Sequence, residues 1–110
     1  MSITPQDEAR VLGLVPKGIY VNGEWRDSSD RSVIDVIDPA TGKVLAQVAN
    51  ATPQDGQDAL TAAHNAQAAW AKTSPRSRAE ILRKAFDKVT EMADEFAILM
   101  ALEMGKPVAE

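Results

Sequence analysis

The amino-acid sequence predicts an α+β fold in which β-hairpins fill the first half of the chain and two long antiparallel helices fill the second half. Two observations carry this prediction. Short β-rich runs alternate with turn segments up to residue 50, and apolar residues recur every three or four positions over residues 59–70 and again over residues 82–100. We expect an N-terminal arm at residues 1–17, hairpins at residues 18–50 and helices at residues 52–106.

The arm carries one expected helical turn at residues 7–12 and is broken by a Pro-Lys-Gly segment. A hairpin is predicted directly after it, because Asn22-Gly23 separates an Ile-Tyr-Val run from a Glu-Trp-Arg run. A type I′ turn requires positive φ at both central residues, which Asn and Gly tolerate best. Arms of about three residues are marginal, so this hairpin needs support from another element.

A second, larger hairpin is predicted from strands at residues 32–38 and 43–49. The first strand is rich in Val and Ile, and the second places alternate apolar residues on one face. The Asp-Pro-Ala-Thr-Gly segment between them is typical of a turn, because Pro fixes φ and Gly accepts a left-handed conformation.

The first long helix is predicted to begin at Thr52, which can cap it, with Pro53 in its first turn and Asp55 near the positive end of its dipole. Small residues recur on one face of this helix, which ends at Trp70. We expect Trp70 and Trp25 to be core anchors. The lone His64 has no ligand or acid–base partner at helical spacing, so we expect it on a solvated rim.

The second helix is predicted to begin near Pro75 and to continue for roughly 25–30 residues until Gly105 and Pro107 end it. Its arginines near the start are expected to lie on a solvated face. Opposite them lies a set of apolar residues that we call the apolar stripe: Leu82, Phe86, Val89, Ala93, Phe96 and Met100. Two hairpins and one other helix cannot cover so long a stripe, so we expect its partner to lie outside this sequence.

The composition argues against several classes of function. The 110 residues contain no cysteine, which excludes a thiol nucleophile, a disulfide and a zinc–thiolate site within them. A net charge of −4 without a basic patch disfavours binding to nucleic acid or to an anionic membrane. No apolar run approaches the ~18 residues of a membrane span, and the acidic start does not resemble a secretory leader. We therefore expect a cytoplasmic protein.

Five motifs follow one another in order: Val-Asn-Gly-Glu-Trp, Asp-Pro-Ala-Thr-Gly, Ala-Ala-Trp, Arg-Ala-Glu-Ile-Leu and Leu-Glu-Met-Gly-Lys-Pro. Each is weak alone, but together they span residues 18–108. This series resembles the amino-terminal segment of the NAD(P)-dependent aldehyde dehydrogenase superfamily, and residues 81–107 most resemble its succinate-semialdehyde dehydrogenase branch. The resemblance implies that the chain is the leading part of an α/β Rossmann-like cofactor domain.

The resemblance implies an oxidoreductase that oxidises an aldehyde, here succinate semialdehyde, with NAD or NADP through a covalent intermediate on a cysteine. The family's nucleophilic Cys, general-base Glu, oxyanion-hole Asn and glycine-bearing cofactor motif have no matching position in this chain. We therefore expect no catalytic and no cofactor-binding residue here, and an inactive chain when it stands alone. For the full-length protein, a homo-oligomer (a dimer or a tetramer) is implied.

The resemblance also implies a monovalent-cation site. In the family, its ligands are a backbone oxygen just before the Pro-containing turn and the acidic residue of the last motif. These positions correspond to Val36 or Ile37 and to Glu103, and we assign Ile37 and Glu103. Asp38 stands in this turn where Asn is more usual.

One alternative from a different class stays open, namely a non-enzymatic interaction module. In this hypothesis the apolar stripe binds a partner helix or a second copy of the chain. A continuous reading frame beyond Glu110 would separate the two hypotheses, because only the dehydrogenase requires it.

Overall fold

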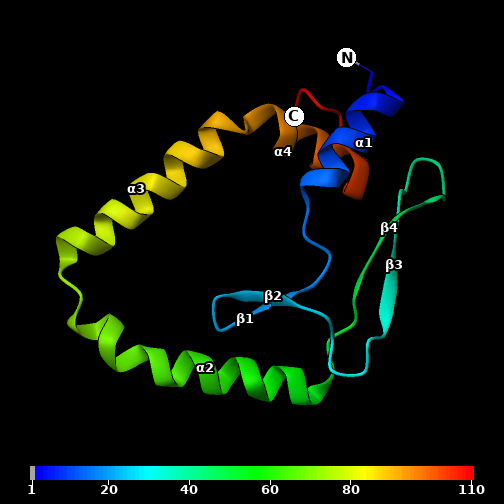
Figure 1. Ribbon diagram of the computed structural model, residues 1–110. Helices are drawn as coiled ribbons and strands as arrows, with labels where there is room; N and C mark the ends of the chain where they lie inside the picture. The colour runs from blue at the N-terminus through cyan, green and yellow to red at the C-terminus, as the bar shows by residue number, and fades with distance from the viewer. Residues whose placement is uncertain (1) are drawn as a thin grey trace.

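The computed structural model describes residues 2–110, and its elements follow the predicted order of hairpins before long helices (Figure 1). The elements are α1 (Pro5–Leu14), β1 (Ile19–Val21), β2 (Glu24–Arg26), β3 (Val33–Ile37), β4 (Val44–Ala49), α2 (Pro53–Lys72), α3 (Pro75–Glu91) and α4 (Ala93–Met104). The strands form two separate antiparallel pairs, β1–β2 and β3–β4. The predicted α+β fold class is therefore confirmed.

Helix α1 is larger than the single turn expected in the arm. Thr4 caps it, since Thr4 Oγ1 accepts a hydrogen bond from the N–H of Asp7 at 3.1 Å and the Asp7 carboxylate accepts one from the N–H of Thr4 at 3.1 Å. The same Thr-Pro-Gln-Asp tetrapeptide recurs at residues 52–55, where it begins α2 with the same capping box. The expectation of one turn is wrong, because this cap begins a helix of 10 residues.

The first hairpin has the predicted turn, with φ of 53° at Asn22 and 80° at Gly23. Its strands pair Tyr20 with Trp25, whose ring centroids lie 5.0 Å apart. The support that this short hairpin needs comes from α2, because Arg26 at the end of β2 forms ion pairs with two carboxylates of that helix.

The second hairpin is also confirmed. Its turn is closed by Asp38, whose carboxylate accepts a hydrogen bond from the N–H of Ala40 at 2.8 Å, and by Gly42 at φ 72°. The β3–β4 ladder has a register shift between Val36 and Ile37, where these residues pair with Ala46 and Val44 and skip Leu45. Such a bulge disrupts the ladder locally and bends the strand.

The second long helix is divided, in contrast to the single helix that the sequence predicts. Helix α3 ends and α4 begins at Met92, where φ is −104° and ψ is 23°. The interruption is local, since the N–H of Met92 still donates to the carbonyl of Lys88 at 3.1 Å and the N–H of Phe96 donates to the carbonyl of Met92 at 3.0 Å. Gly105, at φ 76°, ends α4 as predicted.

The core lies where α1 crosses α4. Val11, Ile98 and Leu102 are buried there, and Ile3, Leu45 and Leu99 pack against them. The expectation that the two tryptophans are core anchors is wrong, since Trp25 is 56% exposed and Trp70 is 47% exposed. Helices α2 and α3 diverge from the short connection at residues 73–74, so neither one covers the other (Figure 1).

The apolar stripe is uncovered, as expected. Leu82 is 73% exposed and Phe86 is 59% exposed, and α3 contains no buried residue. Over residues 2–110, every helix is too short or too polar to cross a lipid bilayer.

Candidate functional site

The candidate site is a cavity of about 140 Å³ in which the carboxyl ends of α1 and α4 meet the β3–β4 hairpin. Residues of three parts of the chain line it: Leu12, Val15 and Lys17 from α1 and the segment after it, Val36, Leu45, Ala46 and Val48 from the hairpin, and Leu99 and Glu103 from α4. The lining is mainly apolar, and two side chains of opposite charge, Lys17 and Glu103, interrupt it.

The two positions assigned to a cation differ in their place at this cavity. Glu103 lines it from the last turn of α4, and Val36, the other residue considered for the backbone ligand, lines it from β3. Ile37 is not among the lining residues and follows Val36 directly at the register shift. The register shift falls at the two residues that the resemblance marks as backbone ligands. A bulge frees backbone groups from the ladder, so a carbonyl oxygen there is available to bind an ion.

The donor chemistry of these residues suits a hard cation. A carboxylate oxygen at Glu103 and a backbone carbonyl at residue 36 or 37 are the ligand types that such ions prefer. In the part of the chain that the structure describes, no cluster of three or more His, Asp or Glu side chains could hold a metal ion.

Lys17 is the functional candidate that sequence reasoning missed. Its half-buried side chain donates hydrogen bonds from Nζ to the carbonyl of Leu12 at 2.5 Å and to the carbonyl of Val15. The position of Lys17 just beyond the end of α1 was a signal for this role, because a lysine there can bind the last carbonyls of the helix. By its composition alone, the Pro-Lys-Gly segment indicates only a break.

A second polar cluster surrounds Asp55 at the start of α2. Its buried carboxylate accepts hydrogen bonds from the N–H of Thr52 at 2.8 Å and the N–H of Ser29 at 3.0 Å, and it pairs with Arg26 at 2.9 Å. The N–H groups of Thr52 and Ser29, together with the Arg26 charge, hold the pKa of Asp55 below its usual range. This cluster joins β2, the following loop and α2, and its role is structural.

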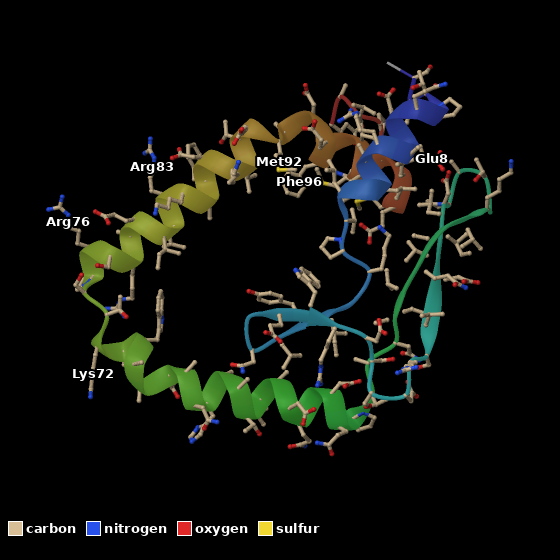
Figure 2. The ribbon with its side chains drawn as sticks, viewed as in Figure 1. Glu8, Lys72, Arg76, Arg83, Met92 and Phe96 are labelled. Atoms are coloured by element: carbon tan, nitrogen blue, oxygen red, sulfur yellow. The ribbon has the colours of Figure 1, made fainter. Side chains whose placement is uncertain are left out.

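Two further hollows are lined mainly by apolar side chains. A shallow one of about 380 Å³ on α2 is lined by His64 and Trp70 among others, and His64 is exposed, as expected. An apolar pocket of about 260 Å³ between α1 and α4 includes Met92 and Phe96, which point to the inner side of the α3–α4 bend (Figure 2).

Arg76 and Arg83 of α3 are exposed, whereas Arg78 is half-buried. Arg76 and Arg83 point away from the rest of the molecule (Figure 2), and each pairs with a carboxylate one turn later. Surface pairs of this kind contribute little to stability and do not indicate an anion site.

Comparison with protein-family patterns and comparison with known proteins both indicate the same family. Residues 25–110 match the sequence pattern of the aldehyde dehydrogenase family. A succinate-semialdehyde dehydrogenase of Paenarthrobacter nicotinovorans is 60% identical over 67 residues, which make up 61% of this chain and 15% of that protein. The mitochondrial succinate-semialdehyde dehydrogenase of Oryza sativa subsp. japonica is 36% identical over 104 residues, or 94% of this chain and 20% of that protein.

The fold is shared with solved enzymes of the same family. The crystal structure of betaine aldehyde dehydrogenase from Staphylococcus aureus in complex with NAD⁺ superposes with a TM-score of 0.88 at 26% identity, covering 94% of this chain and 22% of that one. The chain thus spans about a fifth of the length of these relatives. The matched residues and the shared fold together establish that this chain belongs to the aldehyde dehydrogenase family.

Proposed function

We propose that the chain forms the amino-terminal part of a dehydrogenase that oxidises succinate semialdehyde to succinate. The observation that carries this proposal is the similarity to two succinate-semialdehyde dehydrogenases, one of them over 94% of the chain. The overall reaction consumes the aldehyde, water and NAD⁺ or NADP⁺ and yields the carboxylate, NAD(P)H and two protons. The bound nicotinamide nucleotide supplies the hydride acceptor.

The substrate is the finer part of this proposal. The solved structure reported above is named as a betaine aldehyde dehydrogenase, so a trimethylammonium aldehyde competes with the semialdehyde as the natural substrate. The two substrates differ in the sign of their charge, and an active site complementary to one disfavours the other. Betaine aldehyde dehydrogenases also occur among the sequence relatives, at 41% identity over 83% of this chain. We favour the carboxylate-bearing substrate because the identity of 60%, over 67 residues, is to a succinate-semialdehyde dehydrogenase.

We further propose that these 110 residues alone are inactive and serve as scaffold. They contain no cysteine, so the thiol nucleophile of the proposed reaction must come from elsewhere. The chain's own contribution is the α1–α4 packing and the two hairpins, whose exposed apolar residues are suited to pack against further parts of a cofactor domain.

We retain the cation site as a proposal for Glu103 with a backbone oxygen of Ile37 or Val36. Its support is the shared cavity of Val36 and Glu103 and the bulge next to it. A cytoplasmic location and assembly into a dimer or tetramer also stay predictions for the full-length protein, with no role for nucleic acid or a membrane.

The test is an absorbance assay for NAD(P)H formation, run on the 110-residue chain and on the longest product that contains it. Succinate semialdehyde and betaine aldehyde are compared with each cofactor. Turnover by the longer product alone, fastest with succinate semialdehyde, is expected. Preference for betaine aldehyde would overturn the substrate, and turnover by the 110-residue chain would overturn the scaffold role.

One observation supports the alternative of an interaction module. The apolar stripe is exposed along α3 and α4, with Val89 at 55% and Met100 at 49%, as a helix-binding surface would be. This alternative becomes the better explanation if no longer product exists and the chain binds a helical partner without turning over any aldehyde.

A further inference from the structure

On the basis of the function proposed above, we infer that the guanidinium of Arg78 is the docking point for a carboxylate that the rest of the full-length protein brings to the apolar stripe. The element that covers α3 is then apolar along most of its length and carries one acidic side chain near the start of that helix.

Arg78 lies on the same face of α3 as the apolar stripe. It precedes Leu82 by four residues, and Leu82 precedes Phe86 by four, so the three side chains follow one another along one face of the helix. Leu82 and Phe86 are exposed, whereas Arg78 is half-buried although it is charged. One cation thus stands at the amino-terminal end of a face that is otherwise apolar.

The helix offers Arg78 no carboxylate at the spacing at which its neighbours find one. Arg76 pairs with Glu80 at 3.4 Å and Arg83 pairs with Asp87 at 3.3 Å, in each case four residues later. The positions three and four residues before and after Arg78 hold no acidic side chain: Ser74, Pro75, Ile81 and Leu82.

The other elements do not supply the missing charge either. Within residues 2–110, the ion pairs shorter than 4.0 Å include Arg10, Arg26, Arg76 and Arg83 but not Arg78. In the same residues, no buried side-chain nitrogen lacks a hydrogen-bond partner, so the Arg78 guanidinium still reaches water while the stripe is open.

An element that packs on the stripe changes this situation. The chain spans about a fifth of the length of its relatives, so most of a full-length enzyme lies outside these residues and is available to cover α3. An element seated on Leu82 displaces water from the next turn as well, and a desolvated cation is costly unless it is paired and hydrogen-bonded. A carboxylate meets this need, because two parallel N–H···O bonds match the planar fork of a guanidinium.

The experiment measures the thermal midpoint of the full-length protein in four forms: native, Arg78→Met, Arg78→Lys and Arg76→Met. Each form is measured at mildly alkaline and at mildly acidic pH. Methionine keeps an apolar stem without the charge, and lysine keeps the charge without the planar fork. Arg76 is the matched control, because it lies on the same helix, its side chain is 90% exposed and it pairs with Glu80.

We expect Arg78→Met to lower the midpoint by several degrees at alkaline pH, since it leaves a buried carboxylate without its partner. That carboxylate then has a raised pKa and takes up a proton in mild acid, so the difference from the native midpoint should narrow there. Arg78→Lys should lose less, and Arg76→Met should change little at either pH. His64 and the surface carboxylates titrate in native and variant proteins alike and cancel in the difference.

Three results would overturn the inference. Equal midpoints for Arg78→Met and Arg76→Met would show that the guanidinium stays in water. A loss of the same size at both pH values would show a neutral partner. If Arg78→Met does not fold, a crystal structure of the native full-length protein decides, because the guanidinium must then lie within salt-bridge distance of a carboxylate from outside these 110 residues of the same chain. A carboxylate from a second copy would overturn the occupant named here.

None of these measurements uses aldehyde oxidation. Failure of the proposed dehydrogenase activity is therefore distinguishable from failure of the Arg78 inference.

Discussion

The carboxylate of Asp55 accepts hydrogen bonds from the N–H groups of Thr52 and Ser29 and pairs with Arg26, so one side chain connects a helix start, a loop and a strand. The carboxylate is 1% exposed, whereas Arg26 keeps 40% of its side chain in contact with solvent. A buried charge is tolerated only when its hydrogen-bonding capacity is filled, and every partner here favours the ionised form.

The first prediction concerns Asp55→Asn. The variant loses the charge that Arg26 and the two N–H groups require, so we expect a lower thermal midpoint at neutral pH. Because the folded-state pKa of Asp55 is lowered, its stabilisation is complete above the unfolded value of about 3.9 and is lost as the pH falls through the folded value. The difference between native and variant midpoints, measured by circular dichroism, should therefore shrink in acid.

Asp87→Asn serves as the control for this measurement. Asp87 pairs with Arg83 on the surface of α3, where its side chain is 61% exposed, so we expect a small effect at every pH. A midpoint difference for Asp55→Asn that stayed constant from neutral pH into acid would show that the carboxylate contributes by its shape alone.

Sequence reasoning found only part of this cluster. The cap by Thr52 and the place of Asp55 were predictable because capping is local and spans three residues. Arg26 lies 29 residues from Asp55 and Ser29 lies 26 residues from it, so only tertiary packing brings them together. The same limit applied to the candidate cavity, where the resemblance marked Glu103 and no local pattern linked it to Lys17.

At the scale of elements, the contact between α1 and α4 carries the core. Val11 from α1 meets Ile98 and Leu102 from α4, and Arg10 pairs with Glu95 at 2.9 Å beside them. Helix α1 precedes residues 25–110, to which the family pattern was matched, yet it supplies a residue that is only 2% exposed. We therefore regard α1 as a part of the folded unit.

The second prediction tests this core with Leu102→Ala. Leu102 is 5% exposed, and truncation of such a residue leaves a cavity that lowers the free energy of unfolding by about 2–5 kcal/mol. Leu82→Ala is the matched control, because Leu82 is 73% exposed and should change the free energy by less than about 1 kcal/mol in the 110-residue chain. Urea denaturation of the chain measures both, and equal losses would contradict the assignment of the core.

The elements themselves were predictable to different degrees. Both hairpins were found because their turns depend on local chemistry, such as positive φ at Asn22 and Gly23. The break at Met92 was missed because the three- and four-residue spacing of the apolar stripe runs through it without interruption. The exposure of Trp70 was missed because a sequence pattern identifies an apolar face but not the element that covers it.

At the scale of the whole molecule, the chain is more open than a compact domain of its size. Its radius of gyration is 17.2 Å, whereas a compact chain of this length has about 13 Å. Its accessible surface is 8395 Å², against about 5,900 Å² for a compact monomer of 11.8 kDa. The excess is consistent with uncovered faces on α2 and α3, and surfaces of this extent associate with other apolar surfaces in water.

The third prediction follows from that surface. We expect the isolated 110-residue chain to self-associate as its concentration rises, because the apolar stripe has no partner within it. Leu82→Glu combined with Phe86→Glu places two charges on the stripe and should shift the sedimentation-velocity distribution toward the monomer. Arg76→Glu combined with Lys84→Glu introduces the same residue type at exposed positions of α3 outside the stripe and controls for added acidity.

The same pair of stripe substitutions should act in the opposite direction in the full-length protein. There the stripe is expected to be covered by other parts of the cofactor domain, so two buried glutamates would leave unpaired charges and cause misfolding and loss of aldehyde oxidation. A monomeric, cooperatively folded 110-residue chain would contradict the uncovered stripe. Full activity of the stripe variant in the longer product would contradict the burial of the stripe there.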